Sequence, residues 1–162
     1  MQAGLAAVIL AAGKGTRMKS ALPKVLHPIC GQPMLHYPLQ ASQQAGFKQL
    51  QVVAGHQAEL VRETFAAEQV SWVEQTEQLG TGHALMCAAE ALTSFRGTLL
   101  LLCGDVPLLR AETLQEMLTF HNQQQATVTV LTAEMPNPTG YGRIIRNGEQ
   151  VLQIVEEKDA RD

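Results

Sequence analysis

Short apolar runs alternate with longer amphipathic stretches along the chain. Four runs have the length and composition of buried or half-buried strands: residues 5–12, 49–54, 70–74 and 98–103. Four stretches between and after them carry helical signals: residues 33–46, 57–67, a segment that begins at Thr81, and 111–124. This alternation predicts an α/β fold, a Rossmann-like, doubly wound and mostly parallel sheet with right-handed crossovers.

Local signals delimit two of these helices. Pro33 at the first position and Gly46 just past the end bound the first helix, and Pro38 inside it is expected to kink or delay it. The segment from Thr81 carries apolar residues at helical spacing, namely Ala84, Leu85, Ala88 and Leu92.

The last third of the chain has strand patterns. Residues 126–133 alternate and are rich in β-formers, which predicts one strand, and 98–103 is expected to be fully buried. Asn147-Gly148 lies between two further β-rich stretches, residues 143–146 and 149–156, and predicts a β-hairpin near the C-terminus with a type I′ turn.

Composition excludes several classes of function. The 162 residues suit one domain, and 12 Lys and Arg against 15 Asp and Glu give a net charge of −3. No basic field points to nucleic acid, and no apolar run is long enough to span a bilayer. Cys30, Cys87 and Cys103 show neither disulfide nor zinc spacing, so we expect reduced thiols and a cytoplasmic location.

The loop after the first apolar run is rich in glycine and cations. Residues 10–18 read LAAGKGTRM, and Pro23-Lys24 follows at a short distance. Glycine lets a backbone approach a ligand closely, and Lys14, Arg17 and Lys24 can surround a polyphosphate. The pattern predicts a phosphate-handling loop, the alternative being a tight turn with surface cations. It is neither a P-loop, since Val8 replaces the first glycine, nor a dinucleotide fingerprint, since Met18 replaces the third.

A second candidate position follows the apolar run at residues 98–103. Asp105 there can hold Mg²⁺ together with waters and substrate phosphates, or can cap a following helix. Ligands bind at the carboxyl ends of strands in doubly wound sheets. We therefore expect Gly13 and Asp105, which both follow buried strands, to share one crevice.

Taken in order, four segments resemble the nucleoside-diphosphate-sugar pyrophosphorylases. LAAGKGTRM with Pro23-Lys24 is similar to the entry motif of that family. Three segments resemble the base-recognition, metal-binding and sugar-binding parts of bacterial N-acetylglucosamine-1-phosphate uridylyltransferases: residues 75–84 (QTEQLGTGHA), residues 104–108 (GDVPL), and residues 138–143 (PTGYGR) with 155–160 (VEEKDA). Many of these are bifunctional enzymes that also carry an acetyltransferase domain.

The resemblance implies Mg²⁺-dependent uridylyl transfer from UTP to N-acetylglucosamine-1-phosphate, giving UDP-N-acetylglucosamine and pyrophosphate. This reaction supplies precursors of peptidoglycan and lipopolysaccharide. The sugar phosphate is already an anion, so no general base is expected. The alternatives are a thymidylyl-, cytidylyl- or molybdopterin guanylyltransferase, or a nucleotide-binding fragment without turnover.

Residue roles follow from the same resemblance. It implies that Arg17 and Lys24 are catalytic cations, that Asp105 is the metal ligand, and that Gly142 and Glu156 bind the sugar. The implied nucleotide-binding residues are Leu10, Ala11, Ala12, Gly13, Lys24, Gln75, Gly80, Thr81, Cys103, Gly104 and Asp105.

Plainer roles stay open for several of these positions. Thr81 can be only a helix N-cap, Gly142 a bulge, and Glu156 a solvated strand end. His83 is expected to be structural or a contact near the base, without a catalytic role. Cys103 stands where Tyr is common in the family.

The resemblance also implies how the chain is organised. Residues 1–162 are expected to be the N-terminal part of a nucleotidyltransferase (pyrophosphorylase) domain. The end of that domain, which includes a second metal ligand, and any acetyltransferase β-helix domain are expected to be absent. Through such a β-helix domain the full-length protein is expected to form a homotrimer.

Overall fold

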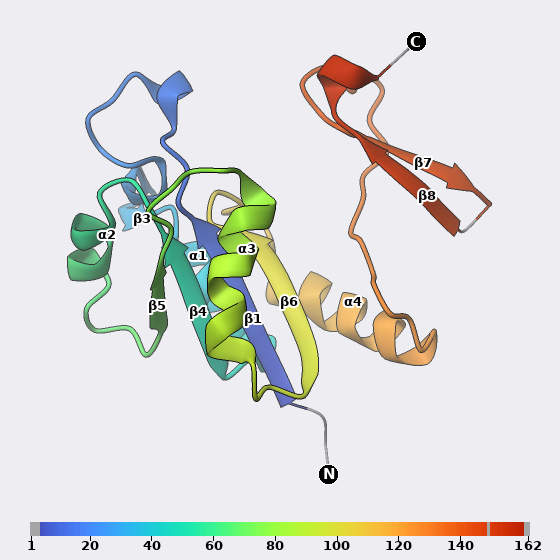
Figure 1. Ribbon diagram of the computed structural model, residues 1–162, viewed down its shortest axis with the longest axis horizontal. Coiled ribbons are helices and arrows are strands. Elements are labelled where there is room, and N and C mark those ends of the chain that lie inside the picture. Colours follow the sequence, from blue (N-terminus) through green and yellow to red (C-terminus); the bar gives the residue numbers. More distant parts are fainter. Residues whose placement is uncertain (1–3, 149, 161–162) are drawn as a thin grey trace. The chain divides into compact units, whose positions relative to one another are not determined.

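The computed structural model describes residues 4–148 and 150–160 of the chain (Figure 1). It comprises two compact units, Met1–Thr119 and Phe120–Asp162. Each unit is built differently, the first around a parallel sheet and the second around an antiparallel strand pair.

The first unit is organised around a four-stranded sheet with the order β5-β4-β1-β6. Its strands are β1 (Gly4–Ala11), β4 (Gln49–Ala54), β5 (Ser71–Glu74) and β6 (Gly97–Cys103). All neighbouring pairs are parallel, and β1 pairs with both β4 and β6. The predicted α/β fold with a parallel sheet is therefore confirmed.

Helices cover both faces of this sheet (Figure 1). They are α1 (His36–Gln44), α2 (Ala58–Thr64), α3 (Thr81–Ala89) and α4 (Ala111–Gln123). Side chains along β1 alternate, so that Ile9 packs in one apolar cluster with Leu39 and Leu114, and Val8 packs in the other with Ala84. Both Val8 and Ile9 are fully buried, which explains why β1 reads as an unbroken apolar run.

The first helix begins later than predicted, at His36 instead of residue 33. Pro33 lies in the short strand β3 (Gln32–Pro33), which pairs antiparallel with β2 (Pro28–Ile29). Pro38 is the third residue of α1. The N–H groups of the first helical turn have no intrahelical acceptor, so proline at this position costs no hydrogen bond.

Short 3₁₀ segments complete the described residues: η1 (Thr16–Met18), η2 (Lys24–Leu26), η3 (Glu90–Leu92) and η4 (Glu157–Asp159). No helix among residues 4–148 and 150–160 combines the length and apolar character needed to cross a bilayer.

The prediction that residues 98–103 are fully buried is wrong. β6 is an edge strand, and α3 packs chiefly over β1 and β4. Leu100 and Leu102 are buried on the face that α4 covers, whereas Leu99 and Leu101 are 38% and 42% exposed. An unbroken apolar run does not by itself reveal which of its faces a helix covers.

The second unit contains the predicted hairpin. β7 (Arg143–Asn147) pairs antiparallel with β8 (Gln150–Val155), with a bulge at Ile145/Arg146. Asn147 pairs with Gln150, so the turn lies one residue later than expected, and Glu149 is outside the described residues.

The predicted strand at residues 126–133 is wrong, because these residues form neither helix nor strand. β7 and β8 pair with each other, which leaves the alternating segment without a described partner for a ladder. Val128 is 75% exposed, and the Nδ1 of His121 lies 2.8 Å from the hydroxyl of Thr129.

We expect Ile9→Ala to lower the free energy of unfolding by about 2–5 kcal/mol, because it empties a fully buried site at the centre of the sheet. Urea denaturation followed by circular dichroism measures the change. Leu108→Ala is the control, since Leu108 is 89% exposed, and its effect should stay within about 0.5 kcal/mol. Equal effects of the two substitutions would contradict the packing described for β1.

Candidate functional site

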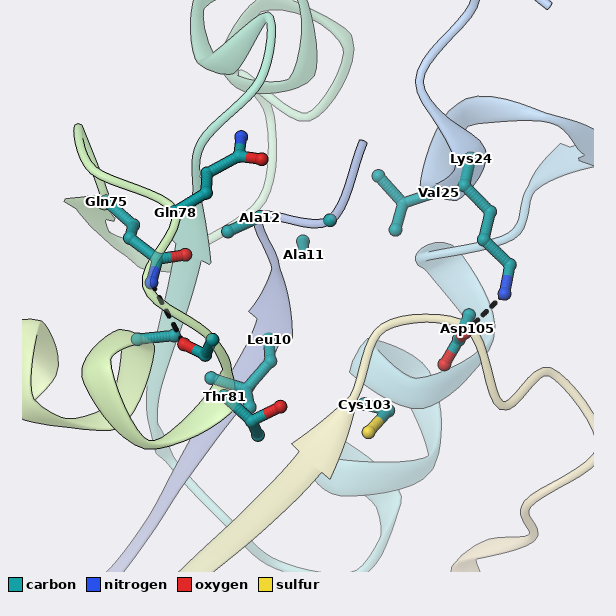
Figure 2. A pocket seen from close by; sticks show the side chains of 13 residues that line it. Leu10, Ala11, Ala12, Lys24, Val25, Gln75, Gln78, Thr81, Cys103 and Asp105 are labelled. Carbon is teal, nitrogen blue, oxygen red and sulfur yellow. Dashed lines mark hydrogen bonds and ion pairs between the residues drawn. The ribbon is translucent and has the colours of Figure 1, made fainter. Parts of the chain in front are cut away.

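A cavity of about 360 Å³ lies at the carboxyl ends of β1 and β6 in the first unit (Figure 2). This volume falls within the range of small-molecule sites, roughly 300–1,000 Å³. Its lining residues are Leu10, Ala11, Ala12, Gly13, Lys24, Val25, Gln75, Gln78, Gly80, Thr81, Ala84, Cys103 and Asp105. All the predicted nucleotide-binding residues except Gly104 are among them, and Gly13 and Asp105 share the crevice as expected.

Sequence reasoning missed two lining residues and left a third undecided. Val25 and Ala84 are apolar: nothing in the sequence separates Val25 from a core residue, and Ala84 is expected on the apolar face of its helix although it lies in the segment 75–84. Gln78 lies in the same segment, where a glutamine can equally contact a ligand or hold the loop by hydrogen bonds. Only the structure shows that Gln78 lines the cavity.

Gly104 holds the end of β6 against β1. Its N–H donates to the carbonyl of Leu10 at 2.8 Å. A Cβ at this position would lie 3.0 Å from that carbonyl oxygen and 3.2 Å from Leu35 Cδ1. Glycine at position 104 therefore allows the backbone after β6 to approach the Leu10 carbonyl closely, just before Asp105.

The segment predicted to handle phosphate contributes Lys24 to the cavity in addition to residues 10–13. Val25 and Leu26 are buried, and they fix η2 so that Lys24 extends towards the end of β6. Gly15 has φ +59°, and a Cβ there would lie 2.8 Å from Lys24 Cβ. A glycine at 15 thus lets the preceding loop lie against Lys24.

Lys24 and Asp105 form an ion pair across one end of the cavity (Figure 2). Lys24 Nζ lies 2.5 Å from Asp105 Oδ2, and the two side chains are 34% and 36% exposed. Pairs with this exposure contribute about 1 kcal/mol or less, so a ligand can separate them at low cost. The pair presents one cation and one carboxylate to any bound phosphate.

The other two predicted cations lie outside the cavity lining. Arg17 is exposed in η1, and Lys14 is exposed in the loop before it. Neither has a hydrogen bond or ion pair among the described residues. The catalytic role predicted for Arg17 is not tested by this arrangement and stays a prediction.

The opposite end of the cavity is built by Gln75 and the start of α3. Gln75 is 4% exposed, and its N–H donates to the Ala54 carbonyl at 2.8 Å, which continues the β4–β5 pairing. Its Nε2 donates to the Gly80 carbonyl at 3.1 Å. Gly80 is the N-cap residue of α3, with φ +98°.

Two of the plainer roles are wrong. Thr81 is the first residue of α3, so it does not act as the N-cap. Asp105 caps no helix either, because α4 begins only at Ala111. Both side chains instead line the cavity.

Asp105 is the only acidic residue that lines the cavity, and no group of three or more His, Cys, Asp or Glu side chains occurs among the described residues. Mg²⁺ commonly binds through one or two carboxylates together with waters and substrate phosphates. A single carboxylate that is 36% exposed and lies beside the Lys24 ammonium fits such a site. Asp105 is therefore the residue that would hold the ion.

The residues predicted for the sugar lie in the second unit, near the base of its hairpin. Arg143 pairs with Val155, which brings the preceding Gly142 opposite Glu156. A Cβ on Gly142 would lie 3.2 Å from the Val155 carbonyl oxygen. The structure thus brings these two positions together, and their roles stay predictions.

Comparison with known proteins identifies a family for this chain. The model of the MobA-like NTP transferase domain matches residues 7–162. "Bifunctional protein GlmU" of Syntrophotalea carbinolica is 61% identical over 156 residues, which cover 96% of this chain and 34% of that protein. The protein of the same name from Pelobacter propionicus is 60% identical, with the same coverage. The chain thus spans about a third of the length of these curated relatives.

Solved structures agree with the fold. A nucleotidyl transferase from Methanothermobacter superposes with a TM-score of 0.63 at 26% identity, covering 70% of this chain and 56% of that chain. A Bacillus anthracis protein provisionally named a glucose-1-phosphate thymidylyltransferase has a TM-score of 0.78 over 95% of this chain and 65% of its own. At 17% identity the second likeness shows the fold alone.

We expect slow alkylation of Cys103. Partial burial of its sulfur raises the pKa of the thiol, the Asp105 carboxylate raises it further, and the Lys24 ammonium opposes both. Because the thiolate is the nucleophile, the rate should rise with pH above the ordinary thiol range. Removing the negative charge with Asp105→Asn should lower the pKa and speed the reaction.

Iodoacetamide labelling, with each cysteine quantified by peptide mass spectrometry, measures this rate. Cys30 serves as the internal reference in the same sample, because the residues Cys30 and Cys103 are both exposed. Slower labelling of Cys103 in Asp105→Asn than in the unaltered chain would contradict the electrostatic account.

Proposed function

The chain belongs to the MobA-like NTP transferase domain family, and from this premise we propose that it catalyses uridylyl transfer from UTP to N-acetylglucosamine-1-phosphate. The products are UDP-N-acetylglucosamine and pyrophosphate. The observation that carries the proposal is one cavity with a lysine and a carboxylate at one end and a buried amide at the other. The names of the relatives, which are 61% and 60% identical, support the choice of substrates.

Charge neutralisation is the main task at the phosphate end. Both substrates are anionic, so the sugar phosphate oxygen can approach the α-phosphorus only when this repulsion is offset. We infer that Lys24 bridges the reacting phosphates and that Arg17 stabilises the leaving pyrophosphate. Magnesium, held by Asp105, would supply further charge stabilisation at the same phosphates.

No general base is required in this scheme. The attacking group is a phosphate oxygen that is already ionised near neutral pH, so no proton has to be removed. Catalysis then consists of positioning and electrostatic stabilisation.

Base recognition falls to the other end of the cavity. The Gln75 side chain offers its amide oxygen, and the first turn of α3 offers backbone N–H groups that lack intrahelical acceptors. This set of one acceptor beside donors matches a uracil edge. Gly142 and Glu156 are proposed to bind the acetamido sugar, by close backbone approach and by accepting hydroxyl hydrogens.

A second candidate function is nucleotide binding without turnover. The observation that favours it is the cavity lining, which among the described residues offers one carboxylate. One carboxylate can hold an Mg²⁺ that arrives with a nucleotide, but it leaves the ion with a single protein ligand during the reaction. Cytoplasmic location and trimer formation stay predictions.

Calorimetric titration with UTP, with and without Mg²⁺, tests the nucleotide site. We expect Mg²⁺ to tighten UTP binding and CTP, GTP and dTTP to bind more weakly than UTP. Asp105→Asn should abolish the Mg²⁺ enhancement, whereas Glu116→Gln, which removes an exposed carboxylate on α4, should leave it unchanged. The same Mg²⁺ enhancement in Asp105→Asn would refute the metal assignment.

The substitution Lys24→Met tests whether Lys24 acts on the reaction rate more than on UTP binding. We expect it to slow pyrophosphate release at least about 100-fold while weakening UTP binding less than about tenfold, because the lysine acts on the developing charge. Lys48→Met, which removes an exposed cation outside the cavity, is the matched control. Equal losses in rate and affinity would contradict this role, and no pyrophosphate from the unaltered chain would favour the binding function.

A further inference from the structure

The orientation of the Gln75 amide is set by chemistry. The Gly80 carbonyl oxygen can only accept a hydrogen bond, and the amide atom at 3.1 Å from it must therefore be the nitrogen Nε2. Gln75 is 4% exposed, so this contact is largely shielded from water. Turning the amide over would place its oxygen against this carbonyl oxygen, so the Gly80 carbonyl is the first of two groups that oppose rotation.

His83 takes part in the same arrangement. Its Nδ1 lies 3.0 Å from Gln75 Nε2. Because Nε2 carries only hydrogens, Nδ1 accepts in this contact, which requires a tautomer with no hydrogen on Nδ1. The Cys87 sulfur, one helical turn further along α3, lies 3.9 and 4.0 Å from the two ring nitrogens.

These two contacts use both hydrogens of the Gln75 amide. Its oxygen has no donor among the described residues, and in Figure 2 it faces the space beside Leu10 and Ala12, which line the same cavity. Gly80 and Thr81, where α3 begins, line the same cavity, and the first N–H groups of that helix have no intrahelical acceptor. The base end of the cavity thus presents a fixed acceptor beside donors.

This pattern discriminates between pyrimidines. Uracil has a carbonyl oxygen beside a ring N–H, an acceptor and a donor that complement the site. Cytosine has an amino group beside an unprotonated ring nitrogen, the reverse order. A Gln75 amide free to rotate could satisfy either base, so discrimination depends on the contacts with the Gly80 carbonyl and with His83 that together oppose the rotation.

We propose that His83 is a positioning residue that holds the Gln75 amide and thereby makes the site select uracil over cytosine. The inference rests on the proposed function, because it concerns the base-binding end of the same cavity. His83 itself does not line the cavity, so its effect passes through Gln75.

The test is the ratio of the dissociation constants for CTP and UTP, measured by calorimetry with Mg²⁺ on the full chain. His83→Leu removes the acceptor and should lower this ratio about tenfold, the effect of losing one hydrogen bond to a buried group. His83→Asn should keep the ratio within about threefold, because its side-chain oxygen can occupy the place of Nδ1. A purely structural role for His83 would not predict rescue by asparagine.

His83→Gln keeps a polar amide but moves the acceptor to the place of Nε2, so it should also lower the ratio. If circular dichroism shows that His83→Leu does not fold, His83→Gln is measured in its place. Unchanged ratios in folded His83→Leu or His83→Gln, with a clear preference for UTP in the unaltered chain, would overturn this inference alone. An unaltered chain without preference for UTP would overturn the proposed function and the inference together.

Discussion

The parallel pairing of β1 with both β4 and β6 is the constraint on which the site depends. Parallel strands end at the same edge of a sheet, so the loops that follow them must meet there. β1 is buried on both faces, and its register places Leu10 opposite Cys103 on β6. The glycine-rich loop after β1 and the turn that carries Asp105 therefore converge at this edge. No contact between their side chains is needed to bring them together.

Strand positions that follow from burial can be predicted from the sequence. Features that depend on which helix or strand packs beside a segment cannot. β4 begins and ends where predicted, at Gln49 and Ala54, because helices cover both of its faces. β6 is more apolar than β4, yet its Leu99 and Leu101 are exposed because α3 packs chiefly over β1 and β4. The alternating segment at residues 126–133 fails as a strand for a related reason, since alternation describes side chains and a ladder needs a partner.

The candidate site shows the same division. Positions directly after strands, such as Gly13 and Asp105, were predictable because topology places them at the ligand edge of the sheet. The Lys24–Asp105 pair was not, since 81 residues separate its members. The relation between Gln75 and His83 was also hidden, because it depends on which atom of an amide faces the Gly80 carbonyl.

The exposed edge of β6 bears on how the cavity moves. Amide hydrogens of a strand that is paired on both sides exchange with solvent only when the sheet opens, whereas outward-facing amides of an edge strand exchange without such opening. Leu10 and Ala11 are the last residues of the doubly paired β1, whereas Cys103 ends β6 and Asp105 follows it. One wall of the cavity is thus anchored in the best protected part of the sheet. The wall that carries Asp105 follows a strand that is paired on one side among the described residues, so fluctuation of that strand can shift it.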